Sequence, residues 1–133
     1  MPTSELARLG REVIADGRLK HLRETLGLSR AAMAELLHVS NYTYAQWERK
    51  GDAANPWVST AERVARFHAM AWTEIRLLQE LGIDITGMLP FHIAATRLGL
   101  PQEMLLDHYR RGRVKATDAG ILGLWVRPED ITS

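Results

Sequence analysis

Two short helical segments separated by only three residues restrict the folds that this chain can adopt. Residues 30–37 and 41–49 carry apolar side chains at helical spacing. Ser29 and Ser40 stand where each helix would begin and are good N-caps, and Ala34 is small enough to let the helices cross closely. The positions that a three-helix core needs are filled by Leu37, Val39, Tyr44 and Trp47. This segment predicts a bundle of short helices built around a tight turn.

Helical spacing continues on both sides of this segment. The stretch 5–26 is divided by Gly17, and a long helix over 60–81 opens with Ser59 and Glu62 at the spacing of a capping box. Three later elements are expected, namely helices over 90–98 and 101–112 and a β-hairpin of 114–117 and 121–126 around Asp118-Ala119-Gly120.

The predicted fold class is therefore mainly α. It has an N-terminal helix-turn-helix bundle, a long central helix, and a second small helix-turn-helix with a C-terminal β-hairpin wing. The polar, turn-rich residues 51–57 are the expected linker. We expect an N-terminal domain over 1–54, a linker and central helix over 55–88, and a C-terminal domain over 89–133.

Composition narrows the functional classes. The chain has 133 residues, 46% of them hydrophobic, and no cysteine, which excludes disulfides and thiolate zinc sites. No apolar run approaches the ~20 residues of a membrane span, and the net charge is only +1. The five histidines are scattered, and no phosphate loop, dinucleotide fingerprint or nucleophile elbow occurs. We expect a cytoplasmic, non-enzymatic protein with no metal, cofactor, small-molecule ligand or membrane partner.

The second of the two short helices has hydrogen-bonding side chains at its outward positions, namely Asn41, Tyr42, Thr43, Gln46 and Lys50. Asparagine and glutamine can pair with adenine through two hydrogen bonds, and the threonine methyl can contact a thymine methyl. Because an α-helix is narrow enough to enter the major groove, this face predicts contacts to DNA bases.

A resemblance to a known family is carried by residues 22–51, LRETLGLSRAAMAELLHVSNYTYAQWERKG. They resemble the Xre and Cro-type repressors of phages and bacteria in LGLS, the small Ala34, VS at the turn, the T-x-x-x-W-E pattern and the closing Gly51. Two positions depart from the family, which usually has glycine at His38 and isoleucine or valine at Tyr44, so the core must be rearranged locally.

The resemblance implies a role for each side of the second helix. Glu48 would hold the end of this recognition helix, and Arg30 would contact phosphate, as we also expect of Lys50. The residues expected to face bases are Asn41, Tyr42, Thr43 and Gln46.

A weaker copy of the motif appears when the sequence is shifted by 61 positions, from residue 30 to residue 91. The positions of Ala34, Leu37, Val39, Tyr44 and Gly51 then fall on Ala95, Leu98, Leu100, Leu105 and Gly112. Residues 91–112 are therefore expected to form a second helix-turn-helix. Its outward residues would be Gln102, Glu103, Asp107, His108 and Arg110, of which Gln102 and Glu103 are expected to face bases.

The C-terminal stretch 94–131 is similar to excisionase and MerR-like winged modules. The similarity rests on a Gly-Arg pair after the second helix, a hairpin, and an acidic pair before an apolar residue, namely Gly112, Arg113, Trp125, Arg127, Pro128, Glu129, Asp130 and Ile131. It departs from these modules at the wing tip, where Asp118-Ala119-Gly120 replaces the usual basic residues. Phosphate contacts are expected from Arg110, Arg111, Arg113 and Lys115.

These features predict a sequence-specific, double-stranded DNA-binding transcriptional repressor. A central helix of about 22 residues spans roughly 33 Å, close to the ~34 Å of one DNA turn. We therefore expect one monomer to occupy an asymmetric site through two unlike motifs. The layout resembles the immunity repressors of temperate mycobacteriophages, which implies a role in lysogeny and superinfection immunity.

Two alternatives remain open from the sequence. One is an excisionase-like architectural factor that bends DNA. The other is an antitoxin-type module that binds a protein, which predicts an exposed apolar face around Trp57, Phe67 and Trp72.

Overall fold

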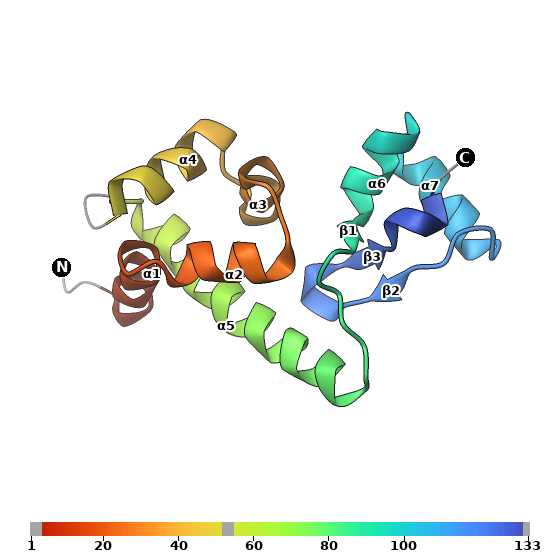
Figure 1. The fold of residues 1–133 in the computed structure, drawn as a ribbon. Coiled ribbons are helices and arrows are strands. Elements are labelled where there is room, and N and C mark those ends of the chain that lie inside the picture. The colour runs from red at the N-terminus through yellow and green to blue at the C-terminus, as the bar shows by residue number, and fades with distance from the viewer. Residues whose placement is uncertain (1–3, 52–54, 132–133) are drawn as a thin grey trace. The chain divides into compact units, whose positions relative to one another are not determined.

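The chain folds into short helices with a small sheet near its C-terminus, as a computed structural model of residues 4–51 and 55–131 describes (Figure 1). It divides into two compact units, Met1–Thr73 and Glu74–Ser133. The predicted fold class, mainly α with a β-hairpin, is confirmed. Of the predicted linker, residues 52–54 lie outside the described part of the chain.

The first unit is built from α1 (Glu5–Ala15), α2 (Arg18–Leu26), α3 (Arg30–Leu37), α4 (Asn41–Lys50) and most of α5 (Val58–Glu80). The break at Gly17 and both helices of the predicted turn are confirmed. The hydroxyl oxygens of Ser29 and Ser40 accept hydrogen bonds from the amides of Ala32 (3.1 Å) and Thr43 (3.0 Å), as N-caps do.

The start of the long helix differs from its prediction. Helix α5 begins at Val58, so Ser59 lies inside its first turn and is not an N-cap. The predicted capping box of Ser59 and Glu62 is wrong because the helix starts two residues earlier than residue 60.

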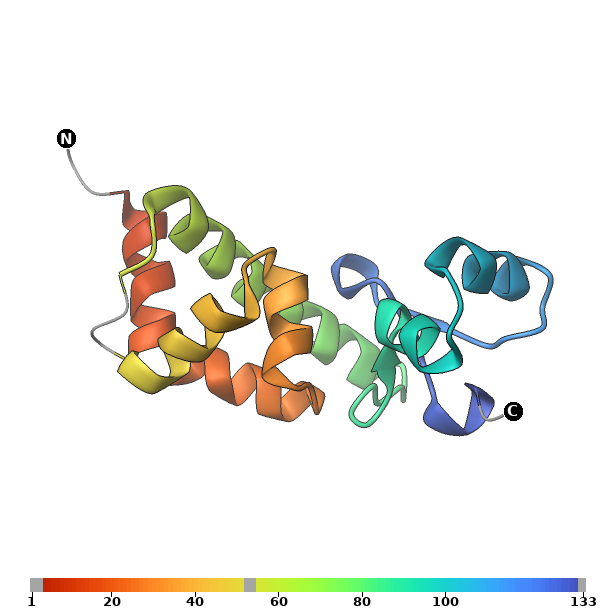
Figure 2. The ribbon, with the colours of Figure 1, turned by 90° about the horizontal axis from the view of Figure 1, so that it is seen from above.

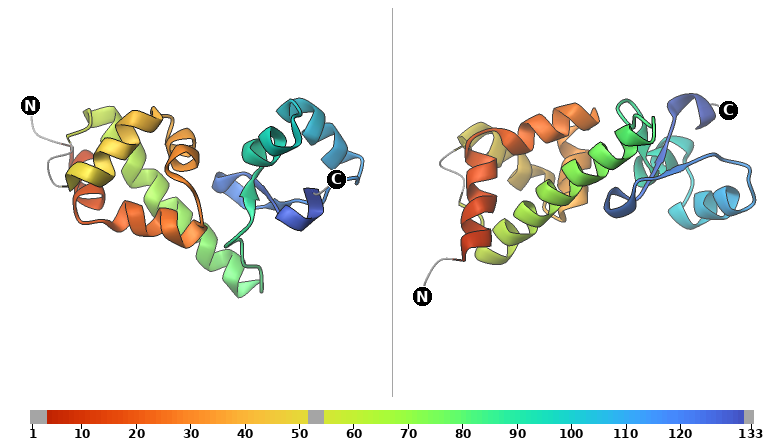
Figure 3. Two further views of the ribbon diagram at one scale, coloured as in Figure 1. Left: turned by 45° about the horizontal axis from the view of Figure 1, so that its top comes forward. Right: turned by 90° about the horizontal axis from the view of Figure 1, so that it is seen from below.

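The core of the first unit joins all five helices. Its fully buried side chains include Val13, Leu22, Leu26, Met33, Leu37, Tyr44 and Val64. Helix α1 and the first turns of α5 lie side by side (Figures 2 and 3). A Cβ atom built on Gly10 of α1 would lie 2.6 Å from the carbonyl carbon of Ala61 and closer still to its oxygen. Only glycine permits this approach of the two backbones.

The second unit holds α6 (Phe91–Leu98), α7 (Gln102–Arg110) and a three-stranded antiparallel sheet. Strand β3 (Leu124–Val126) lies between β1 (Leu89–Pro90) and β2 (Thr117–Asp118). The strands of the hairpin are shorter than predicted because Gly120–Leu122 forms a 3₁₀ turn at its tip. Strand β1 was not predicted, since its partner lies more than thirty residues away.

Helices α6 and α7 and the sheet all contribute side chains to the core of the second unit. Ala94, Ala95, Leu105 and Val126 are buried there, with Phe91 and Val114 among the side chains packed against them. Trp125 is fully buried, and its indole N–H donates a 2.9 Å hydrogen bond to the carbonyl oxygen of Leu122. The hairpin tip is therefore tied to β3.

The turn between α6 and α7 repeats the turn between α3 and α4 in the 61-residue register. The Val39 amide donates to the Ala34 carbonyl and the Leu100 amide to the Ala95 carbonyl, both at 3.0 Å. Both second helices begin eleven residues after the first, at positions 41 and 102. The backbone of residues 91–110 therefore forms the predicted second helix-turn-helix.

The residue that ends the first helix of each turn has left-handed backbone angles. Gly99 has φ 69° and His38 has φ 58°. In the described part of the chain, His38 is the only non-glycine residue with positive φ. A side chain there costs about 1 kcal/mol relative to glycine, which explains why glycine suits this turn.

Candidate nucleic-acid interface

The outward face of α4 is the first candidate interface. Asn41, Tyr42 and Lys50 are exposed, Tyr42 by 74%, while Thr43 and Gln46 are half-buried. The Ser40 hydroxyl donates to the Thr43 hydroxyl oxygen at 2.8 Å. The side chains predicted to face bases therefore share one surface of α4, although two of them are partly covered by the protein.

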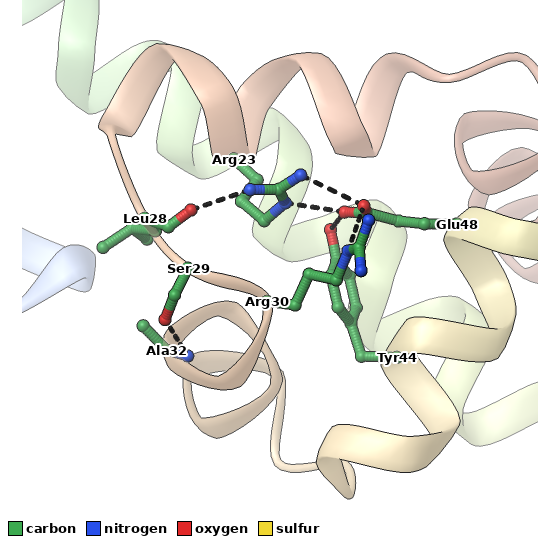
Figure 4. A network of polar contacts seen from close by, with 7 residues as sticks. All are labelled: Arg23, Leu28, Ser29, Arg30, Ala32, Tyr44 and Glu48. Carbon is green, nitrogen blue, oxygen red and sulfur yellow. Dashed lines mark hydrogen bonds and ion pairs between the residues drawn. The ribbon is translucent and has the colours of Figure 1, made fainter.

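A network around Glu48 fixes α4 against its neighbours (Figure 4). The guanidinium of Arg23, on α2, donates to both carboxylate oxygens of Glu48, at 2.7 and 3.1 Å. A third donor atom of Arg23 reaches the carbonyl oxygen of Leu28 at 2.8 Å. The Tyr44 hydroxyl and Arg30 Nε, the latter at 3.2 Å, also donate to the same carboxylate. One buried carboxylate thus joins α2, α3 and α4.

Charge and burial set the ionisation of this network. Burial alone would raise the pKa of Glu48, but hydrogen bonds from Arg23 and Tyr44 and the charge of Arg23 outweigh it and lower the pKa. The hydrogen bond to Glu48 raises the pKa of Arg23 despite the opposing effect of burial. Burial and the hydrogen bond to Glu48 raise the pKa of Tyr44 well above its ordinary value. At neutral pH the network holds one anion, Glu48, between two cations.

The core accommodates Tyr44, where the resembling family usually has isoleucine or valine, by giving its hydroxyl group a partner. Tyr44 is fully buried where an aliphatic residue was expected, and its hydroxyl reaches Glu48. The sequence indicated a structural role for Glu48 but gave no sign of its partner Arg23, which lies 25 residues away. Spacing along one helix could not have found a pair formed between α2 and α4.

Arg30 differs from the other members of the network because its side chain is 60% exposed. Glu48 keeps its contacts to Arg23 and Tyr44 if Arg30 turns outward. Because the guanidinium of Arg30 lies largely in solvent, its pair with Glu48 is screened and stabilises by less than about 1 kcal/mol. The predicted phosphate contact of Arg30 therefore requires only a weak pair to open.

The outward face of α7 is the second candidate interface. Gln102 and Glu103 are exposed beside Met104, which is 48% exposed. Asp107 pairs with Arg111 at 3.1 Å across one turn of the helix, so Arg111 is partly neutralised. The other cations predicted to contact phosphate are all exposed, namely Arg110, Arg113 and Lys115. The backbone here follows the same arrangement as at α4, but this outward face carries the acidic residues Glu103 and Asp107, whereas the only acidic residue of α4, Glu48, is buried.

The apolar face predicted for a protein-binding module is absent as a patch. Trp57 is 85% exposed, but Phe67 is only 8% exposed. Trp72 is half-buried, and its indole N–H donates to His68 Nε2 at 3.1 Å. The prediction that these three side chains form one exposed surface is wrong because α5 turns Phe67 into the core.

Within residues 4–51 and 55–131, no group of three or more histidine, aspartate or glutamate side chains could hold a metal ion. No helix in that part of the chain is long and apolar enough to span a membrane.

Residues 17–78 match the family model of a helix-turn-helix domain, which covers α2 to most of α5 and contains the α3–α4 turn. Such a domain is consistent with a DNA-binding protein. No curated protein and no solved structure matches the chain.

Proposed function

We propose that the chain is a sequence-specific transcriptional repressor that reads double-stranded DNA through two unlike helix-turn-helix motifs. It would block RNA polymerase by occupying an operator. The observation that carries the proposal is the exposed hydrogen-bonding face of α4 on a rigid helix-turn-helix, within the region that matches the domain family.

The first motif supports base reading through its side-chain chemistry. Asn41 and Gln46 can each pair with adenine, and Thr43 and Tyr42 add apolar and hydroxyl contacts. Arg30 and Lys50 flank these residues with positive charge, which attracts phosphate. The Glu48 network holds α4 in place, so little conformational entropy is lost when the helix docks.

The second motif supports a different base preference. Gln102 can pair with adenine, whereas the carboxylate of Glu103 can accept a hydrogen bond from the amino group of cytosine. Arg110, Arg113 and Lys115 provide phosphate contacts, and Arg111 would do so after leaving Asp107. Because the two faces differ, one chain would favour an asymmetric site over a palindrome.

A narrower role follows from this layout. Two unlike motifs in a chain of this size resemble the immunity repressors of temperate mycobacteriophages, so we propose that the protein maintains lysogeny and confers superinfection immunity. The resemblance in layout is what supports this role.

Selection from random duplexes tests the proposal directly. The purified full chain is incubated with the pool at near-physiological salt, and the mass of the complex is measured on the winning site. We expect a long, non-palindromic motif bound by one chain. A short palindrome bound by two chains would contradict the single-chain site and leave α4 as the only reader. No enriched motif would contradict DNA reading as a whole.

Replacing Gln46 by alanine is expected to weaken binding to the selected site by about 1–3 kcal/mol and to relax the preference at one base pair. The measurement is fluorescence anisotropy on the selected duplex and on its single-base variants. Gln79→Ala, at an exposed position of α5, is the matched control. Unchanged affinity and preference in Gln46→Ala would show that the recognition surface lies elsewhere.

A further inference from the structure

A hollow of about 580 Å³ lies beside α4 in the first unit. It is bordered on one side by the turn before α4 and by α4 itself, and on the other by residues 55–63, where α5 begins. The side chains that matter for its chemistry are Tyr42, Gln46, Lys50, Trp57, Thr60 and Arg63. The hollow therefore continues the base-reading face of α4 onto α5.

Two exposed aromatic side chains border this hollow. Trp57 is 85% exposed and Tyr42 is 74% exposed, the two largest values among the large hydrophobic side chains of the described residues. A single exposed hydrophobic residue needs no explanation, but two aromatic rings on one hollow indicate a contact surface.

Trp57 is held on a fixed piece of backbone. The preceding Pro56 is buried, and its carbonyl oxygen accepts hydrogen bonds from Arg11 Nε at 3.3 Å and Arg11 Nη2 at 3.0 Å. The carbonyl oxygen of Trp57 accepts from the Ala61 amide at 2.8 Å, within the first turn of α5. The indole is thus presented to solvent by a segment that is anchored on both sides.

The charge of the hollow selects its occupant. Lys50 and Arg63 bring positive charge, and no aspartate or glutamate occurs among its described lining residues. A polyanion with apolar C–H groups between its charges complements such a surface, and the DNA backbone alternates phosphate with deoxyribose in this way.

We infer that one strand of the duplex backbone lies in this hollow, with Lys50 and Arg63 on phosphates and Trp57 packed against deoxyribose. The inference rests on the proposed function and extends its interface from α4 to α5. Contacts to phosphate and sugar position the protein and carry no base preference. Trp57 and Arg63 therefore set affinity, whereas Gln46 sets preference.

The test compares Trp57→Ala and Arg63→Ala with matched controls on the same helix, Met70→Ala and Arg66→Ala. Both control positions are exposed and lie outside the hollow. Binding to the selected duplex and to an unrelated duplex is measured over a range of salt. We expect Trp57→Ala to bind both duplexes about tenfold more weakly, since it loses the burial of much of an indole. Arg63→Ala should reduce the slope of log affinity against log salt by about one.

A second measurement keeps the inference testable if a variant folds poorly. In the wild-type chain, Trp57 is the most exposed of the tryptophans, so it should dominate quenching of the fluorescence by acrylamide. Addition of the selected duplex should protect that fraction of the emission, and Trp57→Phe should lose the protected fraction while keeping most of the affinity.

The outcomes separate this inference from the proposed function. If Trp57→Ala and Arg63→Ala bind like their controls while Gln46→Ala loses preference, the hollow does not hold DNA although α4 reads it. If the Trp57 emission stays unprotected in the complex, DNA likewise does not cover the hollow, and the two aromatic rings would then serve to bind a protein. If the wild-type chain binds no duplex, both proposals fail.

Discussion

Replacing Gly10 by alanine is expected to destabilise the first unit by about 3 kcal/mol or more. A helical glycine normally gains about 1 kcal/mol on this change, because alanine favours the helix. Here the new methyl group would overlap the carbonyl oxygen of Ala61, which belongs to the backbone of α5 and cannot rotate away. Helices α1 and α5 would have to separate, which opens the core between them. Urea unfolding followed by circular dichroism measures the loss.

The double variant Gly10→Ala/Ala61→Gly distinguishes backbone from side-chain overlap. Removing the Ala61 methyl leaves its carbonyl oxygen in place, so the double variant should be no more stable than Gly10→Ala. Recovery of stability in the double variant, or a Gly10→Ala protein as stable as the wild type, would contradict the close approach of the two backbones.

Replacing Glu48 by alanine is the second change with a large expected effect. Arg23 would keep its charge with only 14% of its side chain exposed, and the buried hydroxyl of Tyr44 would lose its acceptor. Breaking a buried ion pair on one side costs about 3–5 kcal/mol. Urea unfolding should show this loss, and binding to the selected duplex should fall with it, since Glu48 is what ties α4 to α2.

Glu12→Ala is the matched control, because Glu12 pairs with Arg8 at 3.3 Å where both side chains are more than half exposed. Its loss should stay below about 1 kcal/mol. An equal effect of the two substitutions would contradict the role given to burial.

The pH dependence of stability provides an independent check on Glu48. Its pKa is lowered in the folded chain, so the unfolded chain takes up a proton first, near the ordinary value of about 4.3. The stabilisation is complete above that pH and is lost as the pH falls toward the folded-state pKa. Glu48→Gln should show a weaker loss in this window than the wild type.

The helix-turn-helix elements could be predicted because their signals are local. Ser29 and Ser40 cap helices that begin at the next residue, and Gly17 breaks a helix within its own stretch. The second turn could be predicted because the first supplied its register. The predictions at Ser29, Ser40 and Gly17 each depend on residues within about one helical turn.

Features that depend on distant residues could not be predicted in this way. The contact of Gly10 with Ala61, the pair of Arg23 with Glu48 and the pairing of β1 with β3 each join residues far apart in the sequence. Their chemistry gives no local sign of the partner. From the sequence, a glycine within a helix indicates only a residue that destabilises the helix, and its role in close packing appears only when the neighbouring backbone is known.

Only the part of the candidate interface that lies on one helix could be predicted from the sequence. Helical periodicity identifies which side chains of α4 point outward, but it does not place Trp57 and Arg63 beside them. Trp57 is the last residue of the predicted linker and Arg63 lies on the predicted long helix, and only the folded path of residues 55–63 brings them beside α4. A surface formed by two elements needs the tertiary structure.

The same turn recurs at an interval of 61 residues, so one chain presents two sets of side chains on the same backbone geometry. The outward positions Asn41, Tyr42, Thr43 and Gln46 of α4 have counterparts on α7, so a side chain can be transplanted between these positions without a change of backbone. Met104 corresponds to Thr43, and Asp107 corresponds to Gln46. On the proposed function, the two faces determine their base preferences independently. Transplanting the face of α4 onto α7 is then expected to give a chain that selects a repeated sequence instead of two unlike ones.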